Sequence, residues 1–339
     1  MNKKRVLAML LAGAMALSMI ACGGGNSAST DGSSNDGGAS ASSGSYKVSV
    51  ILKTLAAEYW QYVKSGAEDY ASEHSDKVTV EVKGPSSETA FDEMQNMIET
   101  DLSSGSYDGV IISPLQSDTA AQLVSGTKLP IVAIDTNFTA PEVKSFVGTG
   151  NEAAAKKGGE AAVEAAKAAG WTDIKCIEIA GVQGDQTNTA RMNGYKAGVE
   201  EAGGTFLSDE VQYADATADR ATTAMEAIMQ THPEGIAIIC ANNDDMAMAA
   251  ARAAQGHDAY KNTIFLGFNG DRAACEAILA GQMTMSVAQM AYEMGYKAVE
   301  TMVQVLDGET VDEFVDSGSD VVTPDNAQER LDTLKTQLH

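Results

Sequence analysis

From Tyr46 onward the sequence alternates between short apolar runs and longer amphipathic segments. The run Lys47–Lys53 alternates as a strand does, and Glu58–Glu73 has apolar residues at helical spacing. The same pair of patterns recurs as far as Leu306. Strands that alternate with helices in this way form parallel sheets covered by helices on both faces. About ten strand-like runs exceed one small open sheet, so the sequence predicts an α/β fold with two Rossmann-like domains.

Residues 1–22 have the pattern of an export signal. A basic start precedes an apolar run over residues 6–20, which is too short for a membrane-spanning helix with its flanks. The segment ends in Met-Ile-Ala before Cys22, which resembles a bacterial lipobox, where the cysteine takes a diacylglyceryl group. We therefore expect a lipoprotein signal peptide over 1–21 and a lipid on Cys22; the alternative is an ordinary cleaved signal with a chance cysteine. Residues 22–45 are rich in Gly and Ser and predict a flexible linker behind that anchor.

The chain has 47 acidic and 23 basic residues, giving a formal net charge of −24. This charge repels phosphate backbones and anionic lipid headgroups, so binding to nucleic acid or attachment to a membrane through a basic patch is disfavoured. The cysteines include no Cys-x-x-Cys pair and the histidines are scattered, so we expect no metal and no cofactor. Gly-x-Ser-x-Gly and Walker-type loops are absent, so we expect a binding protein rather than an enzyme. Turnover of a glycoside or nucleotide would indicate the enzyme alternative.

In open parallel sheets the ligand lies beyond the carboxyl ends of the strands, so the residues that follow each predicted strand are the candidates for a site. These candidates are Tyr59, Trp60, Asp135, Arg191, Asn243, Asn269 and Gln289. The aromatic rings offer flat apolar faces, the carboxylate offers two acceptor oxygens, and the amide and guanidinium groups offer donors. A pyranose or furanose needs this mixture, because it has C–H faces that stack and hydroxyls that must be hydrogen-bonded.

Each candidate also has a structural interpretation. The aromatic pair at 59–60 is compatible with packing at a helix start, and Asp135 with capping of the next turn. Asn243 is compatible with an N-cap of the following helix. Arg191 is compatible with pairing to a surface carboxylate, and Gln289 with satisfying backbone groups where the chain crosses between domains. These alternatives stay open from the residues alone.

The same stretches carry a resemblance that spans about residues 46–325. The chain resembles a type I periplasmic sugar-binding protein, the extracytoplasmic receptor of an ABC importer, and is most similar to the ribose- and allose-binding branch. The matching stretches are Lys53-Thr54-Leu55 with Tyr59-Trp60, Ile134-Asp135, Ala190-Arg191 with Gly194-Tyr195, Cys240-Ala241-Asn242-Asn243-Asp244, Gly267-Phe268-Asn269-Gly270 and Ala288-Gln289.

The resemblance implies a role for each of these residues. Tyr59 and Trp60 would be the two aromatic clamps, and Lys53 would be the hydroxyl-binding lysine of allose-like members. The polar ligands would be Asp135, Arg191, Asn243 and Gln289, with Asn269 at the position of a family aspartate. Asn193 is an alternative or helper to Arg191, since the local alignment shifts by one or two residues.

The resemblance also implies the organisation of the chain. It implies an N-terminal lobe of 46–149 plus 291–318 and a C-terminal lobe of 150–290 plus 319–339. Three crossings, near 148–151, 289–291 and 317–321, would form the hinge. Sugar would stabilise the closed form of a monomer, which an ABC permease of the cell membrane then recognises.

Several positions depart from the family pattern. Ala57 stands where an asparagine is usual, Asn269 where an aspartate is usual and Thr136 where ribose binders often have an arginine. The aromatic residue expected near 216–218 is missing. The particular sugar therefore stays open, and the alternative is a same-fold receptor for another small polar ligand, such as a furanosyl signalling molecule or a nucleoside.

Overall fold

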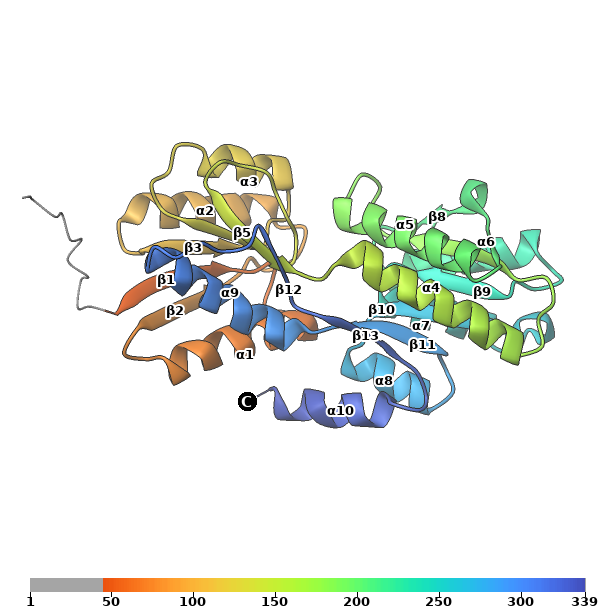
Figure 1. Cartoon of the computed structure of the whole chain (residues 1–339). Coiled ribbons are helices and arrows are strands. Elements are labelled where there is room, and N and C mark those ends of the chain that lie inside the picture. The colour runs from red at the N-terminus through yellow and green to blue at the C-terminus, as the bar shows by residue number, and fades with distance from the viewer. Residues whose placement is uncertain (1–44, 339) are drawn as a thin grey trace, which may run out of the picture. The chain divides into compact units, whose positions relative to one another are not determined.

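The computed structural model describes residues 45–338, which form two sheets flanked by helices (Figure 1). We call the first sheet with its helices the N-lobe and the second sheet with its helices the C-lobe. The predicted signal peptide, Cys22 and the predicted linker up to residue 44 lie outside the described residues. Within 45–338, no helix combines the length and the apolarity needed to cross a membrane.

The N-lobe sheet is parallel throughout. In spatial order its strands are β12 (Phe314–Asp316), β5 (Val143–Gly148), β4 (Ile131–Ile134), β3 (Gly109–Ile112), β1 (Tyr46–Ile51) and β2 (Val78–Lys83). Its helices are α1 (Glu58–Glu73), α2 (Phe91–Ser104), α3 (Ser117–Val124) and α9 (Ala291–Leu306). Ile111 of β3 lies in the same cluster as Val63 of α1, whereas its neighbour Ile112 lies in the cluster with Ile98 of α2. Burial on both faces explains why the central strands β3 and β4 are apolar throughout.

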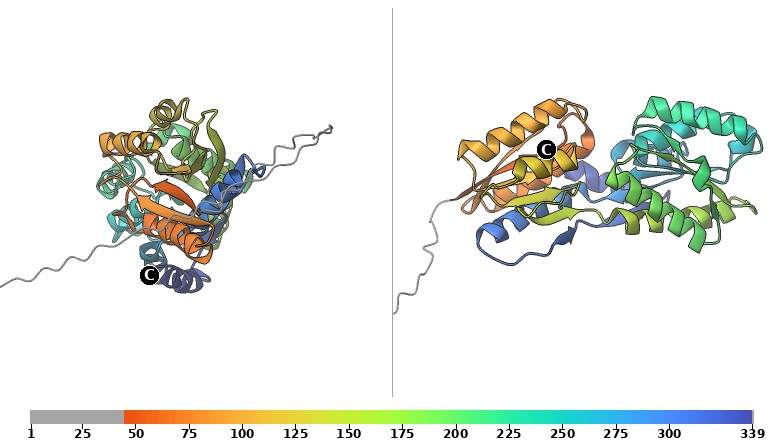
Figure 2. Two further views of the ribbon diagram at one scale, coloured as in Figure 1. Left: turned by 90° about the vertical axis from the view of Figure 1, so that its left-hand side faces the viewer. Right: turned by 90° about the horizontal axis from the view of Figure 1, so that it is seen from above.

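The C-lobe sheet is parallel except at one edge. In spatial order its strands are β13 (Ser319–Val322), β11 (Met285–Gln289), β10 (Ile264–Asn269), β9 (Ile238–Ala241), β6 (Lys175–Ala180) and β7 (Thr205–Phe206), with β8 (Gln212–Tyr213) also paired to β6. Its helices are α4 (Asn151–Ala168), α5 (Gln186–Glu201), α6 (Ala218–Thr231), α7 (Asp244–Ala254), α8 (Arg272–Leu279) and α10 (Ala327–Thr336), with short 3₁₀ turns at Ser208–Glu210 and Asp258–Tyr260. The predicted class, two Rossmann-like parallel sheets covered by helices, is confirmed, and Figure 2 shows this layering from two further sides.

The chain passes between the sheets three times: after Gly148, after Gln289 and after Asp316. Three strands beside these crossings, β5, β12 and β13, are not evident from the sequence pattern. The side chains of β12 and β13 are mostly exposed or half-buried, so no apolar run marks these two strands. Strand β13 also runs antiparallel to β11, which departs from the expectation of purely parallel sheets.

Helices α1 and α9 pack closely because a glycine on each lies at their contact. A Cβ at Gly66 would collide with the carbonyl oxygen of Tyr292, and one at Gly295 would collide with that of Val63. The close approach sets the position of α1, whose first turn carries the predicted aromatic pair.

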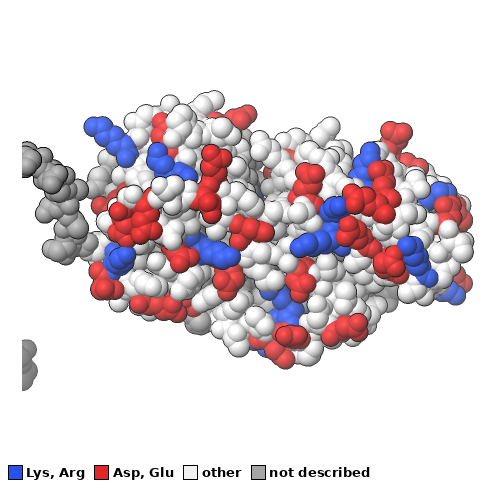
Figure 3. Space-filling view, viewed as in Figure 1, with Lys and Arg blue, Asp and Glu red and all other residues white. Residues whose placement is uncertain are grey.

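On the face of the molecule seen in Figure 3, acidic and basic side chains are interspersed.

Candidate functional site

Asp135 follows β4 directly and adopts a backbone conformation that is uncommon for a residue with a side chain. Its φ is +62°, and its side chain is buried at 9% exposure. No hydrogen bond or ion pair joins its carboxylate to another described residue, so the structure gives no sign that it caps the next turn. Burial raises the pKa of Asp135, while the nearby charges of Lys53 and Arg191 lower it. Strain of this kind is found at functional sites, where the surrounding structure holds it in place.

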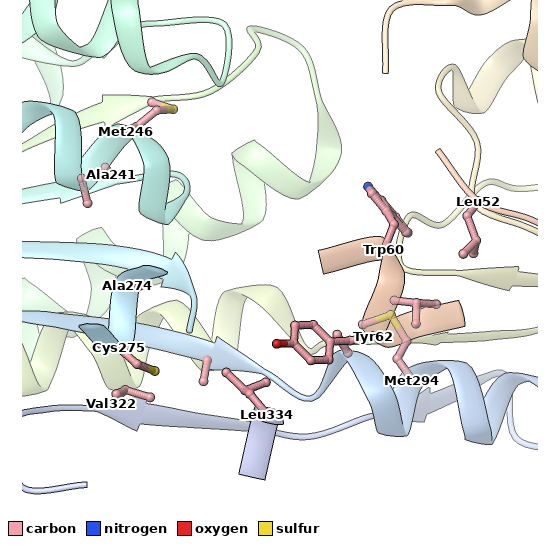
Figure 4. Close-up of a cluster of buried hydrophobic side chains, with 14 of the residues drawn as sticks. Leu52, Trp60, Tyr62, Ala241, Met246, Ala274, Cys275, Met294, Val322 and Leu334 are labelled. Atoms are coloured by element: carbon pink, nitrogen blue, oxygen red, sulfur yellow. The ribbon is translucent and has the colours of Figure 1, made fainter. Parts of the chain in front are cut away.

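The aromatic pair packs against the hydrophobic core, and Tyr59 also lies near the charges of Asp135 and Arg191. The rings of Tyr59 and Trp60 meet edge to face, with centroids 5.0 Å apart; Trp60 belongs to the main hydrophobic cluster, and the half-buried Tyr59 packs against it. Trp60 Nε1 donates to Glu88 Oε1 at 2.8 Å, which fixes the indole ring (Figure 4 shows Trp60 at the start of α1). Burial raises the pKa of Tyr59, Asp135 raises it further and Arg191 lowers it. Tyr59 therefore lies close to residues of both lobes.

Arg191 lies on the buried face of α5 with its guanidinium held on three sides. Its Nε donates to Asn151 Oδ1 at 2.9 Å, its Nη1 donates to the carbonyl of Asn242 at 2.8 Å, and the group lies 3.8 Å from the ring centroid of Phe268. Arg191 is only 6% exposed, so it does not pair with a surface carboxylate. Asn193 is exposed, because two positions along a helix turn about 200° away. The geometry favours Arg191 over Asn193 as the direct ligand, and both roles stay predictions.

The ends of β10 and β11 bring two amides together. Gln289 Nε2 donates to Asn269 Oδ1 at 2.8 Å, and Gln289 is 3% exposed. Asn269 has a φ of +130°, so this strand end, like that of β4, departs from the usual backbone conformation. Asn269 Nδ2 and Gln289 Oε1 have no hydrogen bond to another described residue. Each amide therefore keeps one group available for a ligand.

Asn243 is the N-cap of α7, as its structural interpretation proposed. Its Oδ1 accepts from the backbone N–H of Met246 at 2.9 Å, and its Nδ2 donates to the carbonyl of Ala216 at 3.1 Å. Ala216 is where the sequence lacks the expected aromatic residue. The cap uses part of the amide's hydrogen-bonding capacity, and a ligand role for Asn243 stays a prediction.

Two acidic residues near the site were not among the candidates. Glu88 follows β2 and accepts the Trp60 bond, and Asp185 caps α5 by accepting from the backbone N–H of Asn188 at 2.7 Å. Both raise the pKa of Asp135, so both lie near it. The strand-end rule covers both, since Glu88 follows β2 and Asp185 follows β6, but neither was singled out as a ligand.

A cavity of about 560 Å³ lies elsewhere in the C-lobe. Its lining includes Arg252, His257 and Lys261 together with Thr263 and Thr284, which precede β10 and β11. It therefore opens at the amino edge of the sheet, and no predicted site residue lines it. Among the described residues, no group of His, Cys, Asp or Glu is arranged to hold a metal ion.

A family model for the periplasmic binding protein domain matches residues 48–310. The chain belongs to the periplasmic binding protein family. The D-allose-binding periplasmic protein of Escherichia coli is 30% identical to it over 264 residues, which cover 75% of this chain and 82% of that protein. The ribose import binding protein of Escherichia coli is 27% identical over 268 residues, covering 78% and 86%.

Solved structures agree with this assignment. An ABC transporter solute binding protein from Mycobacterium smegmatis with bound glycerol matches this periplasmic binding protein with a TM-score of 0.71 and 25% identity, covering 84% of this chain and 96% of that one. The resemblance stated from the motifs is thereby confirmed at the level of the family. The relatives are named as binding proteins, which confirms the expectation of a binding protein rather than an enzyme. The roles of individual site residues stay predictions.

Proposed function

We propose that this periplasmic binding protein captures a monosaccharide of the ribose or allose type between the strand ends of its two lobes and delivers it to an ABC permease. The observation that carries the proposal is the environment of Asp135. Its buried carboxylate has no hydrogen bond to another described residue, and it lies near Lys53 of its own lobe and Arg191 of the other. Relatives named for allose and ribose binding support the same ligand class.

The proposed contacts follow from the groups that are free. Asp135 accepts hydrogen bonds from two adjacent hydroxyls, and Lys53 and Arg191 donate to ring or hydroxyl oxygens. The amides of Asn269 and Gln289 contribute one donor and one acceptor. A ring face of the aromatic pair packs against a C–H face of the sugar.

Closure of the lobes follows from the division of these groups. Lys53 and Asp135 lie in the N-lobe, whereas Arg191, Asn269 and Gln289 lie in the C-lobe. A sugar satisfies both sets only when the lobes are closed, so it shifts the population toward the closed form. The permease then recognises the surface of the closed form. We further propose that a lipid on Cys22 anchors the protein as a monomer outside the cell membrane.

A second candidate is another small polar ligand, such as a nucleoside or a furanosyl signalling molecule. Asn269 and Thr136 stand where family members usually have a different polar group, and Glu88 and Asp185 add acceptors beside Asp135. These differences favour a ligand with more donors than a simple pentose offers.

The test is isothermal titration calorimetry on the purified mature chain with D-allose, D-ribose, D-galactose, D-xylose, D-fructose, myo-inositol and adenosine. We expect a monosaccharide to bind, Asp135→Asn to weaken binding by about 10- to 100-fold through loss of charged hydrogen bonds, and Asp332→Asn, an exposed carboxylate of α10, to leave it unchanged. Binding of adenosine without any sugar or polyol would support the second candidate instead. Equal affinities of the wild type and Asp135→Asn would show that Asp135 does not bind the ligand.

A further inference from the structure

Arg330, on the C-terminal helix α10, contacts the ends of two strands that carry site residues. Its Nε donates to the carbonyl of Gly270 at 3.2 Å, and its Nη2 donates to the carbonyl of Gln289 at 2.7 Å. Gly270 directly follows Asn269, and Gln289 is itself a predicted ligand. One guanidinium therefore joins the ends of β10 and β11 at the residues that would contact the sugar.

The same loop is held from its other side by Asp244. Its Oδ2 accepts from the backbone N–H of Gly270 at 2.7 Å, and its Oδ1 accepts from Ser286 Oγ at 2.6 Å. Asp244 has no exposed surface, so these bonds lie in the interior. Gly270 is thus bonded through both its N–H and its carbonyl, and a Cβ there would collide with Ala288.

This arrangement accounts for the backbone of Asn269. A φ of +130° is unfavourable for a residue with a side chain and persists only where neighbouring contacts impose it. The bonds from Asp244 and Arg330 act on the next residue and provide that constraint. The side-chain bond between Asn269 and Gln289 then depends on the relative position of the two strand ends, which Arg330 sets by bonding to both.

We propose that Arg330 is a positioning residue for ligand binding, acting through Asn269 and Gln289 without contacting the ligand itself. The inference rests on the proposed function of that site. The guanidinium is suited to the task because its donors are spaced in a rigid plane and reach two carbonyls at once. A lysine at this position has a single charged centre and cannot hold both strand ends in the same geometry.

The test compares Arg330→Met and Arg330→Lys with Lys335→Gln, which removes a positive charge from the same helix at a residue whose side chain bonds, within residues 45–338, to Asp332 alone. Calorimetry uses the monosaccharide that the wild type binds best. We expect about a tenfold loss of affinity for Arg330→Met, a smaller loss for Arg330→Lys and no change for Lys335→Gln.

A double-mutant cycle separates positioning from general destabilisation. In a background of Asn269→Ala with Gln289→Ala, the effect of Arg330→Met should fall below about twofold, because the groups that Arg330 positions are gone. In an Asp135→Asn background it should persist in full. The same loss in both backgrounds, or wild-type affinity for Arg330→Met, would overturn the inference.

The inference is distinguishable from the proposed function. If the wild type binds no monosaccharide, the proposed function fails on its own. Hydrogen exchange on the ligand-free protein then tests the positioning: Arg330→Met should speed exchange at residues 269–271 and 289–290 relative to Lys335→Gln. Unchanged exchange there would contradict the role of Arg330.

Discussion

Glu58, the first residue of α1, forms a two-point ion pair with Arg272, the first residue of α8. Arg272 Nε lies 2.7 Å from Glu58 Oε1 and its Nη2 lies 3.4 Å from Oε2, and Tyr62 also donates to Oε1 at 2.8 Å. Among the described residues this is the only ion pair that links the N-lobe to the C-lobe. It connects the start of the helix that carries the aromatic pair to the loop that follows Asn269.

Glu58→Gln should weaken ligand binding, because the pair joins the two lobes and we expect their opening to separate it, so that the pair favours the closed form. The side chains of Arg272 and Glu58 are 45% and 34% exposed, so the expected loss of affinity is up to about fivefold, and it should shrink as salt is raised. Titrations at low and high salt measure it. The matched control is Glu68→Gln, whose partner Lys64 lies on the same helix. If Glu58→Gln bound the ligand as tightly as the wild type at both salt concentrations, the pair would have no such role.

Arg191 and Asn193 make a matched pair of substitutions on one helix. Arg191→Met should weaken sugar binding by about tenfold or more, since it removes a buried charged donor. Asn193→Ala should leave binding unchanged, because this side chain is exposed. Calorimetry on both variants decides between them, and a larger effect from Asn193→Ala would reverse the assignment.

Glu178 in β6 should make the stability of the C-lobe depend on pH. Its side chain is fully buried, neither carboxylate oxygen has a hydrogen bond to a described residue, and burial raises its pKa to about 8. The folded state therefore binds a proton that the unfolded state releases near its ordinary pKa of 4.5. The stability that this group contributes is fully present below pH 4.5 and is lost as the pH rises through about 8.

Thermal unfolding between pH 5 and pH 9 checks this expectation. Asp244, whose pKa burial also raises to about 8, titrates in the same window, so the measurement is a difference between variants. The fall in Tm with rising pH should be smaller in Glu178→Gln than in wild type, and it should be unchanged in the exposed control Glu164→Gln. Identical pH profiles for Glu178→Gln and wild type would show that the carboxyl is already charged.

Trp60 should report ligand binding by fluorescence. The chain has two tryptophans, and the other, Trp171, donates to the carbonyl of Asn262 in the C-lobe away from the site residues. Ligand binding changes the surroundings of Trp60 through Tyr59 and Glu88, so the emission change should vanish in Trp60→Phe and persist in Trp171→Phe. A signal that follows Trp171 would place the ligand elsewhere.

The sequence alone determined the repeated strand-and-helix units and the candidates at the ends of the strands. Both follow from local rules: apolar periodicity marks each element, and the carboxyl edge of a parallel sheet collects the residues that follow each strand. This is why Asp135, Asn269 and Gln289 could each be singled out as candidates without a structure, whereas the bond between the two amides came from the structure.

The tertiary structure decided which side chains are already engaged and which are free. It showed the cap at Asn243, the exposure of Asn193, the Glu58–Arg272 pair and the contacts of Arg330. These relationships join residues up to 214 positions apart in the chain, as with Glu58 and Arg272. No local pattern marks the Glu58–Arg272 pair or the contacts of Arg330, because these arise only when packing of α1, α8 and α10 brings distant segments together.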